Sequence, residues 1–188
     1  MLLKNYDIIT LANNHNISGN YNLNAKSYNG TTGTNVSAFP SSSNTCFKTY
    51  NKTDNVPPAS ITGTTLCVGS GDTAVTYEDY TINFISGLTC ISVTQQTDGV
   101  TEDNKFQDSV QVIFCNSNSS AVTIKEIGIF YSGVTGKQAG YSNYLIYREV
   151  LDTPIEVPVG ANVVIKFSKS STIYNNAPAD YVATASVE

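Results

Sequence analysis

The sequence predicts an all-β protein: an antiparallel β-sandwich or jelly roll of about eight strands, with extended polar arms at both ends. Three observations lead to this fold class. Ser, Thr and Asn make up 62 of the 188 residues, and these short polar side chains favour turns and strand faces over helices. Tyr and Phe are frequent, with twelve and seven copies, as is typical of strands. Short apolar segments separated by turn residues recur along most of the chain.

The chain divides into three parts. Residues 1–55 are rich in Asn, Ser, Thr and Gly, and their few apolar residues have no sustained period, so we expect a polar N-terminal arm or extension. Residues 56–170 form the predicted β-sandwich domain. Residues 171–188 have too little apolar content for another strong strand, and we expect a C-terminal tail that is ordered only if another surface receives it.

Eight segments of the central part read as strands. They are residues 61–68, 79–85, 88–95, 107–115, 121–131, 143–150, 154–158 and 161–168. The clearest alternation is in SVQVIFCN, where Val110, Val112 and Phe114 point to one face, and in NVVIKFSK. KEIGIFYSG has apolar residues on both faces, which predicts a central strand.

The glycine-rich stretch GSGDT at 69–73 raises the question of a phosphate-binding loop. A Walker-type loop requires a Lys followed by Ser or Thr that enters a helix, whereas here Asp72 stands where a cation is needed and strand-like residues follow. We therefore expect a turn between strands, in which Gly69 and Gly71 adopt a tight or positive-φ conformation and Asp72 and Thr73 cap it through side-chain bonds.

Other candidate sites have weak support from the residues. The single histidine, His15, lies in an Asn cluster with no second imidazole for zinc and no nucleophile beside it. A group of acidic residues offers oxygen ligands for calcium without the EF-hand order, so we interpret it as a solvated loop. These acidic residues are Asp98, Glu102, Asp103 and Asp108. We assign no catalytic, cofactor-binding or metal-binding residue and expect no enzyme activity.

Arg148 is the only arginine of the chain, in LIYREVLD, against nine lysines. Its planar guanidinium can hold a carboxylate by two parallel hydrogen bonds, which an ammonium cannot do. We predict a fixed ion pair with Glu126 of KEIGIF, and the alternative is a solvent-exposed arginine on an edge strand.

Charge and cysteine content limit the partners. The net charge of −5 and the absence of a basic patch argue against binding to nucleic acid or to an anionic membrane. The sequence contains no run of eighteen apolar residues, which is the pattern expected of a membrane-spanning helix. The four cysteines contain no CxxC pair, and MLLKNYDIITLANNHN has no apolar segment long enough for a signal peptide, so we expect buried, reduced thiols.

Three motifs in fixed order carry a resemblance: LCVGSGDTAVTYEDYTI, then SNSSAVTIKEIGIFYSG, then YLIYREVLDTPIEVPVGANVVIKFS. Together they resemble small β-sandwich structural proteins of tailed bacteriophage virions, over roughly residues 61–168. The resemblance implies a non-enzymatic component of the head, neck or tail that assembles in multiple copies. It also implies localisation in the virion after synthesis in the bacterial host cytoplasm. The implied partners are copies of the chain itself and other virion proteins, and no cofactor is implied.

The alternative is a host-binding module that recognises a surface glycan through exposed tyrosines. Aromatic rings stack on sugar faces, but tyrosines are also common at subunit interfaces. The candidates for glycan or interface contacts are Tyr131, Tyr141, Tyr144 and Tyr147. A third hypothesis, a hydrolase of cell-wall polymer, has no supporting pair of carboxylates in the sequence.

Overall fold

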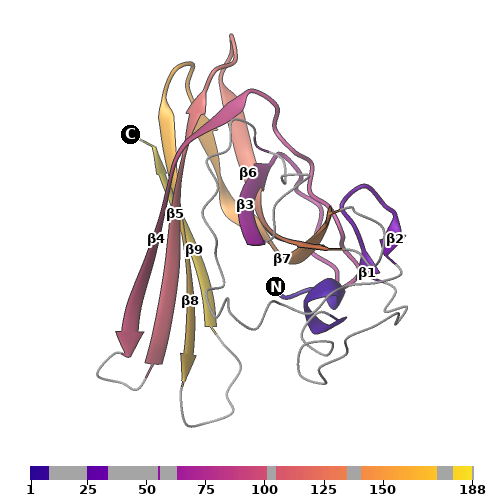
Figure 1. Ribbon diagram of the computed structural model, residues 1–188. Helices are drawn as coiled ribbons and strands as arrows, with labels where there is room; N and C mark the ends of the chain where they lie inside the picture. The colour runs from indigo at the N-terminus through magenta and orange to yellow at the C-terminus, as the bar shows by residue number, and fades with distance from the viewer. Residues whose placement is uncertain are drawn as a thin grey trace.

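The protein is an antiparallel β-sandwich in the computed structural model, which describes residues 1–8, 25–33, 55, 63–100, 105–134, 141–172 and 180–187 (Figure 1). This confirms the predicted fold class. One sheet has the strand order β3-β6-β7, formed by Gly63–Gly69, Val122–Val134 and Tyr141–Val157. The other has the order β4-β5-β8-β9, formed by Leu88–Val100, Lys105–Asn116, Asn162–Thr172 and Asp180–Val187. A small hairpin, β1 (Ala25–Lys26) and β2 (Thr32–Gly33), lies outside both sheets.

Most of the predicted strands are present. Segments 61–68, 88–95, 107–115, 121–131 and 161–168 fall on β3, β4, β5, β6 and β8, and segments 143–150 and 154–158 belong to one long strand, β7. Segment 79–85 was predicted wrongly as a strand. Residues 70–87 instead form the connection between the two sheets, with a single bridge from Gly69 to Phe84. The alternating residues Ile82 and Phe84 pack on the outer face of the three-stranded sheet, and only the Phe84 bridge links this segment to the ladder.

The expectation for the C-terminal tail was also wrong, because residues 180–187 form β9. This strand pairs with β8 from Val163↔Val187 to Ser170↔Asp180, without a register shift. Its small residues Ala183 and Ala185 pack against the core, which explains why so weakly apolar a segment still forms a strand. The division into residues 1–55, 56–170 and 171–188 stays a prediction, but Leu3 and Ala25 from the first part are fully buried on the sandwich.

The main core lies between the two sheets. The alternating residues of β5 and β8 point into it as predicted, and all of them are at most 3% exposed. The three-stranded sheet contributes the facing side chains. The members from β5 and β8 are Val110, Val112, Phe114, Val163, Ile165 and Phe167, and those from the other sheet include Leu66, Val68, Ile127 and Ile129.

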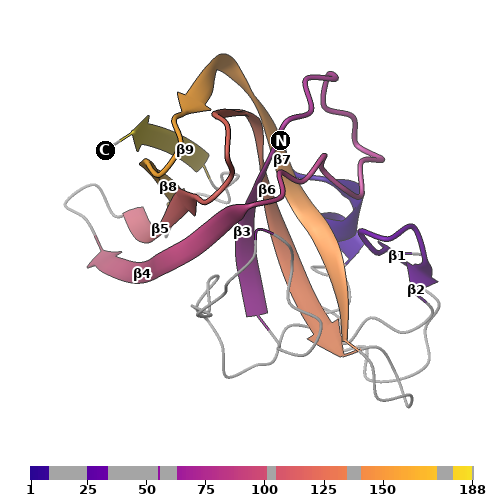
Figure 2. The same cartoon turned by 90° about the horizontal axis from the view of Figure 1, so that it is seen from above.

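The three-stranded sheet is also buried on its outer face. Its residues Cys67, Phe130 and Leu145 pack there with Leu3 and Ile82 into a second apolar cluster. From above, the four-stranded sheet, the three-stranded sheet and the N-terminal turn with the β1–β2 hairpin form successive layers (Figure 2). The central strand β6 is therefore covered on both sides, as KEIGIFYSG predicts.

Short segments cover both edges of the three-stranded sheet. Residues 1–3 lie along β7, where the Leu3 amide donates to the Ile146 carbonyl and the Arg148 amide donates to the Met1 carbonyl, each at 3.1 Å. On β3, the buried Asn55 side chain takes the place of a strand. It donates to the Val68 carbonyl at 2.7 Å and accepts from the Val68 amide at 2.9 Å. Both edges are thereby closed to further pairing at these positions.

Candidate functional site

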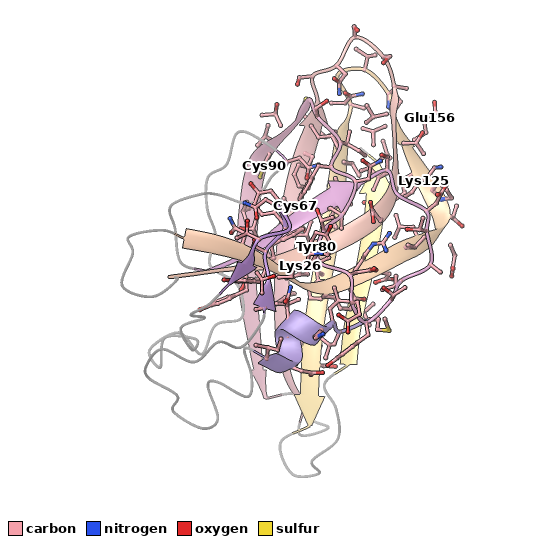
Figure 3. All side chains as sticks on the ribbon, turned by 90° about the vertical axis from the view of Figure 1, so that its right-hand side faces the viewer. Lys26, Cys67, Tyr80, Cys90, Lys125 and Glu156 are labelled. Carbon is pink, nitrogen blue, oxygen red and sulfur yellow. The ribbon has the colours of Figure 1, made fainter. Side chains whose placement is uncertain are left out.

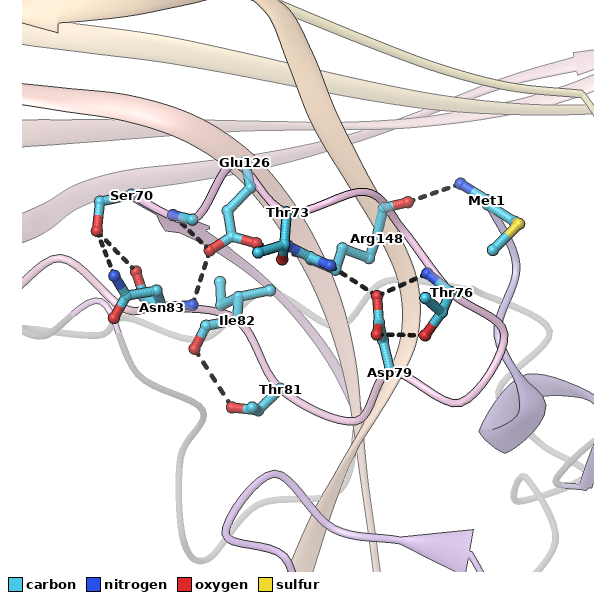
Figure 4. Close-up of polar contacts among 11 residues, drawn as sticks. Met1, Ser70, Thr73, Thr76, Asp79, Thr81, Ile82, Asn83, Glu126 and Arg148 are labelled. Atoms are coloured by element: carbon cyan, nitrogen blue, oxygen red, sulfur yellow. Dashed lines mark hydrogen bonds and ion pairs between the residues drawn. The ribbon is translucent and has the colours of Figure 1, made fainter.

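A polar network lies on the outer face of the three-stranded sheet, around Arg148 of β7 and Glu126 of β6 (Figure 4). Arg148 Nε donates to Glu126 Oε2 at 2.7 Å, and the two side chains are 6% and 0% exposed. The structure thus brings the two residues of the predicted ion pair together in the protein interior, and Arg148 is not a solvent-exposed edge residue. Its Nη1 donates to Asp79 Oδ2 at 2.6 Å, and its Nη2 donates to Thr73 Oγ1 at 3.2 Å. The guanidinium is therefore shared among three acceptors, in place of a two-bond pair with one carboxylate.

The Glu126 carboxylate is held by the glycine-rich segment. Its Oε1 accepts the backbone N–H of Gly71 at 2.9 Å and that of Asn83 at 2.7 Å. Two backbone amides of the 70–87 connection thus bind a carboxylate, and that carboxylate is a side chain of the same protein. These two hydrogen bonds attach the connection to the Glu126 side chain of β6.

The expected conformation of Gly69 and Gly71 needs correction. Among the described glycines, positive φ occurs at Gly30, Gly87 and Gly160 only. The small size of the two glycines matters for another reason: a Cβ added at Gly69 would lie 2.5 Å from Glu126 Oε1, and one added at Gly71 would also meet that carboxylate. Glycine is therefore required where the connection passes over the buried Glu126.

Asp72 and Thr73 do not cap a turn as expected. Asp72 Oδ2 accepts from Lys125 Nζ at 2.7 Å, in a pair whose side chains are 67% and 35% exposed. Thr73 Oγ1 accepts from Arg148. Both side chains therefore reach across to β6 and β7 and attach the connection to the sheet.

The predicted contact tyrosines are mostly in the interior. Tyr131, Tyr144 and Tyr147 are 2%, 0% and 6% exposed and belong to the core cluster, so the expectation that they contact a glycan or another subunit is wrong for this fold. Large aromatic residues on strand faces are as suited to a core as to a surface. Tyr141 lies on β7, and its side chain is outside the described part of the structure.

A turn at residues 76–80, TYEDY, was not singled out by sequence reasoning, yet each of its side chains has a partner. Thr76 Oγ1 donates to Asp79 Oδ1 at 2.6 Å, which closes the turn on itself. The other partners come from three separate segments of the chain. Tyr77 donates to Asp7 at 2.7 Å, Glu78 pairs with Lys4 at 2.9 Å, Asp79 pairs with Arg148 at 2.6 Å, and the Tyr80 ring lies 3.6 Å from Lys26 Nζ.

Arg148 and Asp79 each shift the pKa of the other toward the ionised form. Burial alone would raise the pKa of Asp79, but hydrogen bonds from Thr76 and the ion pair with Arg148 outweigh it and lower that pKa. Burial alone would lower the pKa of Arg148, but Asp79 and Glu126 outweigh it and raise that pKa. The network therefore keeps the Arg148 guanidinium and the Asp79 carboxylate ionised, and it attaches the 70–87 connection to the sheet.

A pocket of about 310 Å³ opens beside this turn. Its walls come from the N-terminal helical turn at residues 4–8, the β1–β2 hairpin and residues 78–80. Lys4, Asn5, Lys26 and Thr32 line it on one side. Lys26 and Tyr80 lie next to each other between the hairpin and the connection (Figure 3). The sequence analysis did not predict this pocket, because its walls come from three segments that are separate along the chain.

The remaining candidates are only partly described. Asp98 and Asp108 lie on β4 and β5, but their side chains, like His15, Glu102 and Asp103, fall outside the described residues. Within the ranges that the structure covers, no group of three His, Cys, Asp or Glu side chains could hold a metal ion. The described part of the chain contains no helix with the length and apolar character needed to cross a membrane.

Comparison of the chain with protein-family models, with curated proteins and with solved structures gives no match.

Proposed function

We propose that this chain is a non-enzymatic structural component of a tailed bacteriophage virion, assembling in multiple copies on the head, neck or tail. The proposal places it in the virion, after synthesis in the bacterial host cytoplasm, with copies of itself and other virion proteins as partners. It is supported by the ordered trio of motifs and by the sandwich fold that those motifs imply. The observation that carries it is the outer edge of β9.

Over residues 181–187, the described part of the chain shows no bulge, charge or covering segment on the outer edge of β9. Within the described residues β9 pairs on one side only, with β8, and its register there is regular. Residues 181–187, YVATASV, contain no charge and no proline, and Val182 and Val187 are 56% and 44% exposed. An uncharged, regular edge of this kind is a template for strand addition by another chain.

The other edges differ from β9. Residues 1–3 cover β7, and Asn55 covers β3. The outer strand β4 has two register shifts, between Cys90 and Ser92 and between Thr97 and Gly99, and such bulges disrupt further pairing. The contrast supports a role for β9 in contacts between copies.

The oligomeric state of the purified chain, measured by light scattering across a range of concentrations, tests the proposal. We expect a lasting symmetric oligomer that dissociates in Val182→Lys, because a lysine on the edge repels the facing copy and its strand. Val159→Lys is the matched control, since Val159 is 57% exposed in the turn between β7 and β8. A strict monomer at all concentrations would contradict assembly in multiple copies.

The alternative role in host-glycan binding loses the tyrosine contacts on which it was based, because three of the four rings are in the core. A glycan array with the purified chain would still detect such binding by another surface.

A further inference from the structure

We propose that the pocket beside the 76–80 turn binds a small carboxylated sugar, with the Lys26 ammonium as the group that pairs with its carboxylate. This inference goes beyond the structural role proposed above and does not depend on it. The charges of the pocket, the contacts of Lys26 and the pocket volume support it.

The carboxylates that line the pocket are already engaged. Glu78 accepts from Lys4 Nζ through both oxygens, at 3.0 and 2.9 Å. Asp79 accepts from Arg148 at 2.6 Å and from the Thr76 amide and hydroxyl at 3.0 and 2.6 Å. Neither is left to attract a cation, so the acidic side chains do not set the charge preference of the pocket.

Lys26 is the lining charge without an ion-pair partner among the described residues. Its Nζ lies over the Tyr80 ring, 3.6 Å from the centroid, and the described part of the chain places no carboxylate within ion-pair distance. An ammonium carries three N–H donors, and the ring satisfies its charge on one side only. The pocket therefore presents spare positive charge and hydrogen-bond donors, which select an anionic ligand.

The backbone of Lys26 is held in place before any ligand binds. The buried Asn5 side chain pairs with the Lys26 backbone, donating to its carbonyl at 2.8 Å and accepting its amide at 3.0 Å. Asn5 also donates to the Leu145 carbonyl of β7 at 3.1 Å, so the hairpin is attached to the sheet. With the Tyr80 ring below it, the ammonium needs little ordering on binding, which favours affinity for a small ligand.

Size and the remaining groups point to a sugar. The pocket volume of about 310 Å³ is at the small end of the range for ligand sites. It is large enough for one sugar unit and too small for a long-chain ligand. Thr32 contributes a hydroxyl, which both donates and accepts, and Tyr80 contributes an aromatic ring. A hydroxylated ring with one carboxylate, as in a uronic acid, complements a hydroxyl, an aromatic surface and one ammonium.

Titration of the full chain with glucuronate, followed by calorimetry or by ligand-observed NMR at millimolar concentration, tests this proposal. We expect binding of glucuronate, no detectable binding of glucose, and weakening by about tenfold or more in Lys26→Gln, because a charge-assisted hydrogen bond is lost. Lys26→Arg should retain binding, since it keeps the charge and the contact with the ring. Lys166→Gln, at an exposed position on β8, is the matched control and should bind as the original chain does.

The thermal midpoints of Lys26→Gln and Lys26→Arg show whether each variant is folded. If Lys26→Gln is not folded, Thr32→Val replaces it, because loss of this hydroxyl should weaken glucuronate binding without removing a charge. Absence of glucuronate binding by the original chain overturns the proposal, as does equal binding by folded Lys26→Gln. Tighter binding of inorganic phosphate than of glucuronate overturns the assignment to a sugar.

Discussion

Arg148 and Glu126 are diagonal neighbours on adjacent strands. Glu126 is directly opposite Val150 in the β6–β7 ladder, and Arg148 is two residues before Val150, so both side chains lie on the same face of the sheet. Gly128 pairs directly with Arg148 in this ladder, and the space above Gly128 is filled by Ile82, Leu145 and Phe130. The register of the two strands therefore brings the pair together, and two backbone amides of the 70–87 connection bind the Glu126 carboxylate.

Arg148→Lys should destabilise the protein by about 1–3 kcal/mol, because a lysine keeps the charge but cannot reach Glu126, Asp79 and Thr73 together. Urea titration measures the effect as a lower midpoint. Lys166→Arg, the reverse exchange at an exposed site, should change stability by no more than about 0.5 kcal/mol. Equal midpoints for the original chain and Arg148→Lys would show that the shared guanidinium does not contribute to stability.

Gly71→Ala should also destabilise the protein, by about 1–3 kcal/mol, because the added methyl group meets the buried Glu126 carboxylate. A double-mutant cycle with Glu126→Ala isolates this contact, since the methyl group should cost less once the carboxylate is gone. Gly160→Ala is a useful contrast: nothing lies within 4 Å of its added Cβ, and only its positive φ opposes the change. Additive effects of Gly71→Ala and Glu126→Ala would mean that the two groups do not interact.

Sequence reasoning recovered the features that depend on local pattern. Alternation in SVQVIFCN and NVVIKFSK identified the core faces of β5 and β8, since one buried face fixes the period of a strand. Sequence reasoning failed where a segment has the alternating pattern of a strand but does not pair with a strand over its length. In residues 79–85 the alternating Ile82 and Phe84 cover the outer face of a sheet, but the segment makes a single bridge to β3.

The site was only half predictable. Glu126 was found as the partner of Arg148 because both lie on predicted strands, whereas Asp79 is 69 residues away and reaches Arg148 only through the course of the connection. The pocket, with Lys26 and Tyr80, depends on how the hairpin lies against that connection. A turn as dense in aromatic and acidic residues as TYEDY is the signal that could have drawn attention to this region.

Asn55→Asp should destabilise the protein by about 1–3 kcal/mol. The amide group of Asn55 donates to the carbonyls of Val68 at 2.7 Å and Ile85 at 3.0 Å, and an aspartate of the same shape has no such donors. A buried carboxylate beside two carbonyl oxygens is also unfavourable, so the loss should be larger at pH 7 than at pH 4, where a protonated aspartate can donate once. Unfolding in urea at both pH values measures this difference, and a pH-independent loss would contradict it.

The Asp79–Arg148 pair should make the stability of the protein depend on pH in the acid range. The pKa of Asp79 is lowered below its ordinary value of 3.8, so the folded state favours the ionised form. The stability that this form contributes is fully present above the unfolded-state pKa and is lost as the pH falls through the lower folded-state pKa. We expect the free energy of unfolding to fall between about pH 5 and pH 2, and Asp79→Asn to make that fall shallower.

Asp72→Asn is the matched variant for this experiment, because the hydrogen bond and charge of Lys125 also lower the pKa of Asp72. The two pairs differ in exposure: the Asp72 side chain is 67% exposed, and the Asp79 side chain is 19% exposed. Salt screens exposed charges far more than buried ones. High salt should therefore remove the effect of Asp72→Asn on the acid dependence and leave most of the effect of Asp79→Asn. Equal sensitivity of the two variants to salt would mean that the Asp79–Arg148 pair is as open to solvent as the Asp72–Lys125 pair.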